Sequence, residues 1–319
     1  MIISVVQIGR IDYATGLRLQ QKLVDLRKQD KIGNVLLLLE HTPVITLGRN
    51  ASRENVLASD DFLKQRGVEL YECDRGGDVT FHGPGQLVGY PIFDLRGFTG
   101  PDGQRKTLGA VDYVRRLEEA LIRTCADFGI ATERVKGMTG VWTQLGVCGD
   151  GPPARPGGSE TRPHTNQSKI AAIGVHISRG VTSHGFALNV TSEPLEYFKL
   201  IVPCGISSKP VTSIERELGR VVAIDEVAPK RERPGKACPE RSRGGREQGA
   251  SESKDPCSGA TPSLDDVAQS IARNFGRVFS AQILWVDTLE ALLGHRVGVP
   301  ARAPEELRKI TGKDDKFWA

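Results

Sequence analysis

Hydrophobic residues recur along the chain at two spacings, and these predict its helices and strands. Between residues 12 and 29 apolar side chains return every three or four positions, which is typical of an amphipathic helix. The same spacing predicts a helix over residues 107–128 with Thr107 as its N-cap, and another over residues 264–279 with Ser263 as its N-cap.

Other apolar runs lack the helical spacing and predict strands. The longest continuous run, Val35 to Leu39, indicates a strand that is buried on both faces. Residues 68–95 have strand-like patterning that is broken by glycine clusters. Shorter strands are predicted at residues 131–135, 140–143, 170–177 and 186–190. The chain is therefore expected to contain both helices and strands.

Two segments do not fit a packed domain. Residues 144–167 and 228–262 are rich in glycine, proline, serine and charge, and they are poor in aliphatic side chains. Such segments bury too little apolar surface to offset the entropy of ordering them, so we expect two disordered insertions in surface loops. The prediction is a single domain over residues 1–285 with these insertions, followed by a C-terminal extension over residues 286–319.

Charge and composition exclude several classes of protein. The chain has 319 residues, 26% of them charged, and a net charge of +4. Residues 228–262 hold eight basic and five acidic residues, so three of the four net charges lie in one predicted insertion and no broad basic surface for nucleic acid is expected. No run of about 18 apolar residues could span a membrane, and residues 1–16 lack the pattern of a signal peptide. A cytoplasmic location is expected.

The six cysteines are widely spaced, and none forms a C-x-x-C pair. This spacing argues against a disulfide scaffold, a zinc ribbon and an iron–sulfur site, and no metal is expected. Three cysteines lie in the predicted insertions. Cys204 lies in a Pro-Cys-Gly turn between apolar residues, where a cysteine is either inert packing or an accessible nucleophile.

The segment RGGDVTFHGPGQLVGY, residues 75–90, has the greatest concentration of candidate functional residues. Its five glycines allow the backbone to turn tightly and to approach a ligand, beside one cation and one imidazole. The alternative is a glycine-rich hairpin with an exposed arginine and a buried histidine. The segment is neither a P-loop nor a dinucleotide-binding fingerprint.

Lys169 opens the apolar stretch KIAAIGVH directly after the first predicted insertion. A lysine at a strand edge is often only a solvated residue, but the small side chains of Ala171, Ala172 and Gly174 leave room here for a ligand. If Lys169 approaches Cys204 in space, its ammonium group would lower the pKa of the thiol. The pair would then form a cysteine/lysine dyad for acyl transfer.

Three motifs together carry a family resemblance. RGGDVTFHGPGQLVGYP, KIAAIGVHISRGVTSHGFALNV and IVPCGI occur in this order and at this spacing, and the chain resembles the octanoyl-[acyl carrier protein]:protein N-octanoyltransferases of lipoate biosynthesis. The resemblance covers roughly residues 3–218 and, more weakly, the helix after Ser263. It implies an α+β (mixed α/β) fold like that of the biotin and lipoate protein ligases, with a mixed sheet packed against helices. The two insertions depart from the family pattern.

The resemblance also implies a mechanism. Cys204 would attack the octanoyl thioester on the phosphopantetheine of acyl carrier protein, and the target lysine of a lipoyl domain would then displace the acyl group from Cys204. Lys169 would be the catalytic lysine that assists Cys204. The residues that fall on the family's substrate-binding segments are Arg75, Gly76, Gly77, Asp78, Val79, Thr80, Phe81, His82, Ala172, Ile173, Gly174, Gly185, Phe186 and Ala187.

The expected partners are octanoyl-acyl carrier protein and the lipoyl domains of 2-oxoacid dehydrogenases and of the glycine cleavage H protein. No separate cofactor is expected, and the protein is expected to be a monomer. Backbone amides at Gly76 and Gly77 are candidates for an oxyanion hole, and His82 is a candidate for orienting the dyad or accepting a proton. The alternatives are an ATP-dependent lipoate protein ligase of the same fold, a non-catalytic acyl-binding protein and a cysteine hydrolase.

Overall fold

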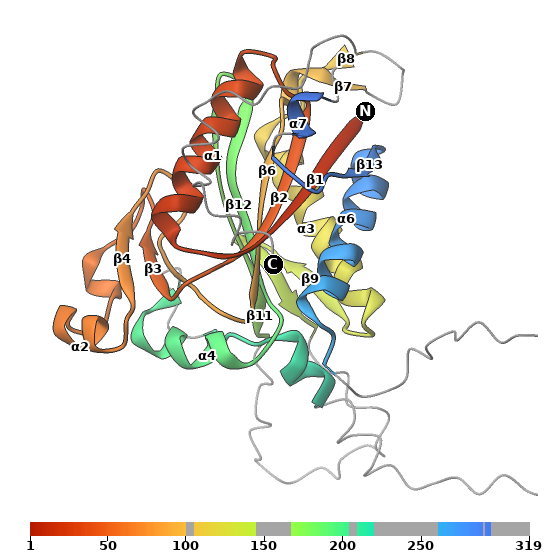
Figure 1. Ribbon diagram of the computed structural model, residues 1–319. Coiled ribbons are helices and arrows are strands. Elements are labelled where there is room, and N and C mark those ends of the chain that lie inside the picture. Colours follow the sequence, from red (N-terminus) through yellow and green to blue (C-terminus); the bar gives the residue numbers. More distant parts are fainter. Residues whose placement is uncertain (100–104, 145–166, 204–208, 220–260, 290, 295–319) are drawn as a thin grey trace, which may run out of the picture.

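A mixed eight-stranded sheet forms the centre of the protein (Figure 1). The computed structural model describes residues 1–99, 105–144, 167–203, 209–219, 261–289 and 291–294. Cys204, nearly all of the two predicted insertions and most of the predicted C-terminal extension therefore lie outside the described residues. The disorder predicted for the insertions stays a prediction.

The strands of this sheet are parallel at one end and antiparallel at the other. In spatial order they are β13 (Gln282–Trp285), β1 (Ile2–Ile11), β2 (Asn34–His41), β6 (Gln86–Ile92), β12 (Val181–Asn189), β11 (Lys169–Ser178), β10 (Met138–Thr143) and β9 (Thr132–Val135). β13, β1 and β2 run parallel to one another, and every later neighbouring pair is antiparallel.

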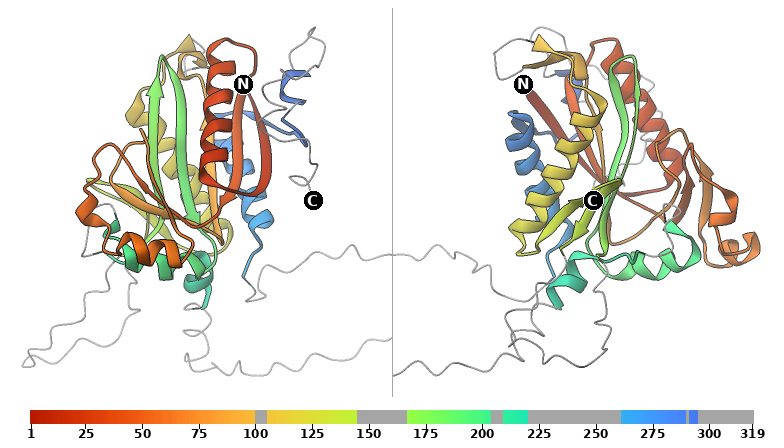
Figure 2. Two further views of the ribbon diagram at one scale, coloured as in Figure 1. Left: turned by 60° about the vertical axis from the view of Figure 1, so that its left-hand side comes forward. Right: turned by 180° about the vertical axis from the view of Figure 1, so that it is seen from behind.

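Helices cover both faces of the sheet (Figure 2). Helix α1 (Tyr13–Lys28) packs on one face against β6 and β12, whereas α3 (Ala110–Asp127) and α6 (Leu264–Phe279) pack on the other. Each face has its own hydrophobic core, and β2 contributes alternate side chains to both. Leu289 and Leu292, which follow β13, pack into the core beneath α1.

A smaller three-stranded sheet lies beside the main one and carries part of the site described below. Its order is β4 (Glu69–Glu72), β3 (Val44–Leu47) and β5 (Val79–His82). A third hydrophobic core lies between this sheet and the short helices next to it. The remaining elements are η1 (Arg53–Asn55), α2 (Asp60–Gln65), η2 (Leu95–Gly97), β7 (Phe98–Thr99), β8 (Arg105–Lys106), α4 (Glu193–Tyr197), η3 (Phe198–Leu200) and α7 (Ala291–Gly294).

The helix predictions are confirmed with one correction. α6 begins after Ser263 as expected, and Ser263 and Asp266 form a reciprocal capping box. α3 does not begin at Thr107: its N-cap is Gly109, which makes no side-chain capping bond. Up to Leu108 the chain is still tied to the preceding segment, because β8 pairs with β7 and the amide of Leu108 donates to the carbonyl of Leu95. The first intrahelical bond runs from the amide of Tyr113 to the carbonyl of Gly109.

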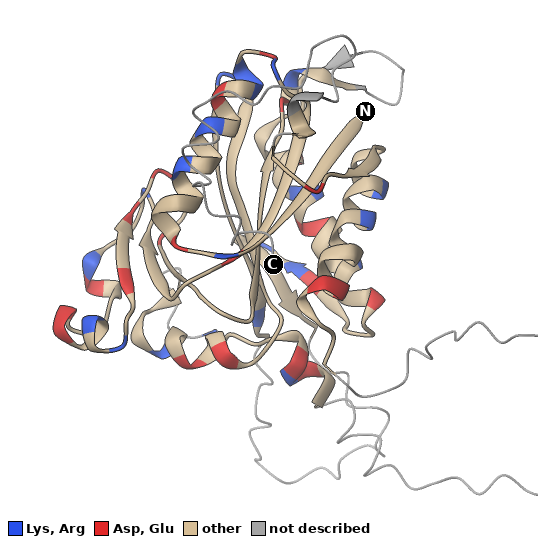
Figure 3. Ribbon diagram, viewed as in Figure 1, with Lys and Arg blue, Asp and Glu red and all other residues tan. Residues whose placement is uncertain are grey.

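The predicted mixed α/β architecture, with helices on a mixed sheet, is also confirmed. Charged residues lie on the outer helices and loops, and the middle strands are largely free of them (Figure 3). Among the described residues, no helix combines the length and the apolar character needed to cross a membrane.

Candidate active site

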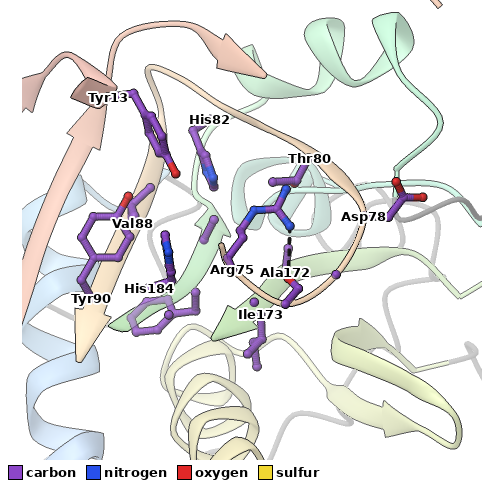
Figure 4. Close-up of a pocket in the computed structure, with 16 residues that line it drawn as sticks. Tyr13, Arg75, Asp78, Thr80, His82, Val88, Tyr90, Ala172, Ile173 and His184 are labelled. Carbon is purple, nitrogen blue, oxygen red and sulfur yellow. Dashed lines mark hydrogen bonds between the residues drawn. The ribbon is translucent and has the colours of Figure 1, made fainter. Parts of the chain in front are cut away.

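A cavity lies between the main sheet, the small sheet and the first residue of α1 (Figure 4). It holds about 490 Å³ of empty space, including the part that is open to solvent. Its lining residues are Tyr13, Arg75, Gly76, Gly77, Asp78, Thr80, His82, Val88, Tyr90, Ala172, Ile173, Gly174, His184, Gly185, Phe186 and Ala187.

The structure brings all the predicted substrate-binding residues to this cavity except Val79 and Phe81. These two lie on β5, where successive side chains point to opposite faces, so Thr80 and His82 face the cavity. Val79 and Phe81 instead pack in the core of the small sheet, where the Phe81 ring stacks on Tyr197 at 4.6 Å between centroids. The sequence assigns all of residues 75–82 to substrate binding, whereas strand alternation turns Val79 and Phe81 away from this cavity.

Arg75 places a buried positive charge at the cavity. Its side chain is held on β3, since Nε and Nη2 donate to Thr46 Oγ1 at 3.1 and 3.0 Å and Nη2 also donates to the Thr46 carbonyl at 2.7 Å. Within the described part of the chain no carboxylate lies within ion-pair distance of this guanidinium, which is only 7% exposed. A buried cation without an anion makes this side of the cavity electropositive. The sequence alternative of an exposed arginine is therefore wrong.

The loop that follows Arg75 crosses directly over β11. A Cβ atom on Gly174 would lie 2.6 Å from the carbonyl oxygen of Gly76, so only glycine fits at this crossing. The Gly76 amide donates to the carbonyl of Val175 at 3.0 Å. It is therefore already engaged, and the prediction that it contributes to an oxyanion hole is wrong for Gly76.

A chain of hydrogen bonds fixes the protonation of His82. Asn189 Nδ2 donates to the carbonyl of Thr212, and Asn189 Oδ1 accepts from Gln86 Nε2 at 2.9 Å. Gln86 Oε1 must then accept from His82 Nδ1, 2.7 Å away. His82 Nε2 is left as an acceptor on the cavity side, and burial lowers the pKa of His82 to about 3.

Lys169 is the first residue of β11 and lines a second cavity next to the first. The two cavities share Thr80, Ala172 and Ala187, so they adjoin. Lys169 is 8% exposed, and its Nζ lies 4.7 Å from the centre of the Trp142 ring, a cation–π contact. A lysine in this position is not the solvated edge residue of the alternative interpretation.

Cys204 lies outside the described residues, but the residue before it does not. Pro203 lines the same cavity as Lys169. The amide of Val202 donates to the carbonyl of Asn55 at 2.7 Å, and Asn55 Nδ2 donates to Asp78 Oδ2 at 2.6 Å. Through Asn55, Asp78 therefore connects the loop that follows Arg75 to the segment that leads into Cys204.

Four residues that line the first cavity are not among the site residues predicted from the sequence: Tyr13, Val88, Tyr90 and His184. Val88 and Tyr90 alternate with Gln86 on β6, and this period-two pattern could have identified them. Tyr13 carries no such signal, because it reaches the cavity only through the packing of α1 on the sheet. Among the described residues, no group of three or more His, Cys, Asp or Glu side chains is arranged to hold a metal ion.

Two buried histidines should make folding sensitive to mild acid. Burial lowers the pKa of His41 to about 4 and that of His82 to about 3, whereas the unfolded chain has a histidine pKa of about 6.5. The unfolded state therefore binds more protons below this value, and stability falls as the pH drops from about 6.5 toward 4. At pH 5 each of these two histidines should lower the free energy of unfolding by about 2 kcal/mol relative to pH 7.

Urea unfolding at pH 7 and pH 5 measures this loss. Equal free energies of unfolding of the parent at both pH values would contradict the assignment of two buried neutral imidazoles.

Residues 12–232 match the family model described as the lipoyl protein ligase A/B catalytic domain. An octanoyltransferase of Koribacter versatilis is 49% identical over 98% of this chain and 98% of its own length. One of Acidobacterium capsulatum is 53% identical over 92% of this chain and 96% of its own length.

Solved structures share the fold at low sequence identity. A lipoate-protein ligase A bound with ATP is 13% identical, with a TM-score of 0.54 over 92% of this chain and 93% of its own. A bipartite lipoate protein ligase from Thermoplasma acidophilum is 12% identical, with a TM-score of 0.55 over 99% of both chains. These similarities confirm the lipoate protein ligase-like fold that the sequence motifs implied.

Proposed function

The chain belongs to the lipoyl protein ligase A/B catalytic domain family and is an octanoyltransferase, and from this premise we propose that it moves octanoyl groups through an enzyme thioester on Cys204. The proposed donor is octanoyl-acyl carrier protein. The proposed acceptors are the target lysines of lipoyl domains of 2-oxoacid dehydrogenases and of the glycine cleavage H protein.

The proposed reaction consists of two acyl-transfer steps. In the first, the Cys204 thiolate forms a bond to the thioester carbon, the bond from that carbon to the phosphopantetheine sulfur breaks, and the released thiolate takes up a proton. In the second, the acceptor amine bonds to the same carbon, the bond to Cys204 breaks, and the amine proton passes to the leaving sulfur. The donor thioester is already activated, so neither step consumes ATP.

The main support for this proposal is that Lys169 and Pro203 line one cavity, which adjoins the cavity lined by the predicted binding residues. Lys169, a buried lysine, thus shares a cavity with the residue that precedes Cys204, and this supports a cysteine/lysine dyad. The adjoining cavity offers small and apolar side chains at Ala172, Ala187 and Val88, which suit an acyl chain.

The transferase and the ligase of the same fold are distinguished by their need for ATP. The test is intact-protein mass spectrometry after mixing the protein with octanoyl-acyl carrier protein in the absence of ATP. We expect an adduct with the mass of one octanoyl group, which hydroxylamine releases and an apo lipoyl domain discharges. Product that forms only from free octanoate and ATP would instead establish a ligase.

A further inference from the structure

Aromatic side chains line the part of the first cavity that lies away from Lys169. Tyr13, Tyr90 and His184, here called the aromatic wall, line the first cavity (Figure 4). None of the three lines the second cavity, which contains Lys169. All three are almost completely buried. The wall therefore lies away from the cavity that holds the proposed catalytic lysine.

The strand register gives the distance from the Lys169 cavity to the aromatic wall. Gln86 and Asn189 are paired neighbours that line the Lys169 cavity. Two residues further along β6 and β12 comes the row of Val88 and Ala187, and Tyr90 follows two residues after Val88. The four residue-to-residue steps from Gln86 to Tyr90 span about 13 Å of strand, which is the length scale of a medium-chain acyl group.

The surface between these ends is formed by small side chains. Ala172, Ala187 and Val88 lie side by side across β11, β12 and β6, and the next row contains the paired glycines Gly174 and Gly185. Tyr90 is the first bulky side chain met on β6 beyond Val88 on this face. An extended acyl chain that starts near Lys169 would pass over the small residues and end at the aromatic wall.

Hydrogen bonds hold the wall in place. His41 Nδ1 donates to the carbonyl of Ile11 at 3.2 Å, so its Nε2 accepts from the Tyr90 hydroxyl, 2.7 Å away. The Tyr13 ring packs edge-on against His41 at 5.2 Å between centroids and lies parallel to the His82 ring at 6.3 Å. A wall fixed on several sides cannot move aside for a longer chain without breaking these contacts.

We propose that the aromatic wall sets the maximum length of the acyl chain, with Tyr90 as its principal specificity-determining residue. The proposal rests on the proposed function, because it needs the acyl carbonyl at the Lys169 end of the cavity. Removing the Tyr90 ring would extend the cavity beyond the position where an octanoyl chain ends. Adding bulk at Val88 would shorten the space before the wall.

The test is a competition among hexanoyl-, octanoyl-, decanoyl- and dodecanoyl-acyl carrier proteins at equal concentrations, with an apo lipoyl domain as acceptor. The masses of the acylated domains give the product ratios. Because one methylene in an apolar pocket changes discrimination by roughly 10–200-fold, Tyr90→Leu should raise the decanoyl-to-octanoyl product ratio at least about tenfold. Tyr90→Phe is the matched control: it keeps the ring and should retain the parent's ratio within about threefold.

Val88→Leu tests the opposite direction and does not depend on the folding of the tyrosine variants. It should shift the products toward hexanoyl. Leu87→Val is its control, since Leu87 packs in the core on the opposite face of the sheet and should leave the product ratios unchanged. If folded, active Tyr90→Leu and Val88→Leu variants gave the same product ratios as the parent, the aromatic wall would not set the length of the acyl chain. If the parent protein transferred no acyl group from any donor, the proposed function would be wrong, and so would the length-limiting role of the aromatic wall.

Discussion

The Cys204→Ala variant is expected to take up no octanoyl group and to lose transfer activity by roughly 10⁴-fold or more, because the reaction would lose its covalent nucleophile. The binding residues around the first cavity are untouched by this substitution, so the variant should still bind the donor. Mass spectrometry of the variant with octanoyl-acyl carrier protein, together with the initial rate of lipoyl-domain acylation, checks both parts of the prediction.

Cys73 provides the matched control. It lies two residues before Arg75, is partly buried, and its Sγ donates to the carbonyl of Leu47 at 3.4 Å. Cys73→Ser keeps a donor for this bond and should retain both the adduct and the transfer rate. If the adduct instead persisted in Cys204→Ala and disappeared in Cys73→Ser, the nucleophile would be Cys73 and the proposed mechanism would be wrong.

Lys169→Met should slow the acylation of Cys204 by about 10²–10⁴-fold, the range over which a positioned proton-transfer group contributes. Methionine has a similar length and can still pack against the Trp142 ring, but it removes the positive charge from the cavity that Pro203 also lines. Without this charge the thiol should ionise near its ordinary pKa of about 8.5. Single-turnover rates between pH 6.5 and 9.5 measure the effect: the rate of the variant should rise steeply with pH, and that of the parent should already be level.

Lys199→Met is the control for this prediction. Lys199 lies five residues before Cys204, is exposed, and pairs with Glu196 at 2.7 Å. Its replacement should leave the acylation rate and the pH profile unchanged. A Lys169→Met variant with the parent's rate and pH profile would show that Lys169 does not assist the thiol, and the dyad would be abandoned.

The sequence was most informative where a structure depends on neighbouring residues. The helix after Ser263 could be located from its spacing and its cap, since both the capping box and the apolar stripe lie within one helix. The start of α3 was less predictable. Thr107 is a good capping residue, but at this point the chain is still tied to β7 and Leu95 in an earlier segment, and the helix begins only after Gly109.

The same contrast applies to the candidate site. The motif around Arg75 identified this loop as part of the site, yet it could not distinguish Thr80, which faces the cavity, from Phe81, which faces a core. That distinction depends on which face of β5 is covered by other elements. Nor could the motif show that the Gly76 amide donates a hydrogen bond to the carbonyl of Val175, because that bond joins a loop to a strand about 100 residues later.

The sequence by itself determined the family, the mixed α/β fold and most of the residues that line the first cavity, because residue types, their order and their local spacing record these features directly. Only the tertiary structure decided which side chains line the end of that cavity away from Lys169. The aromatic wall joins Tyr13 from α1, Tyr90 from β6 and His184 from β12, which become neighbours only when the helix packs on the sheet. Long-range packing of this kind leaves no periodic pattern in the chain.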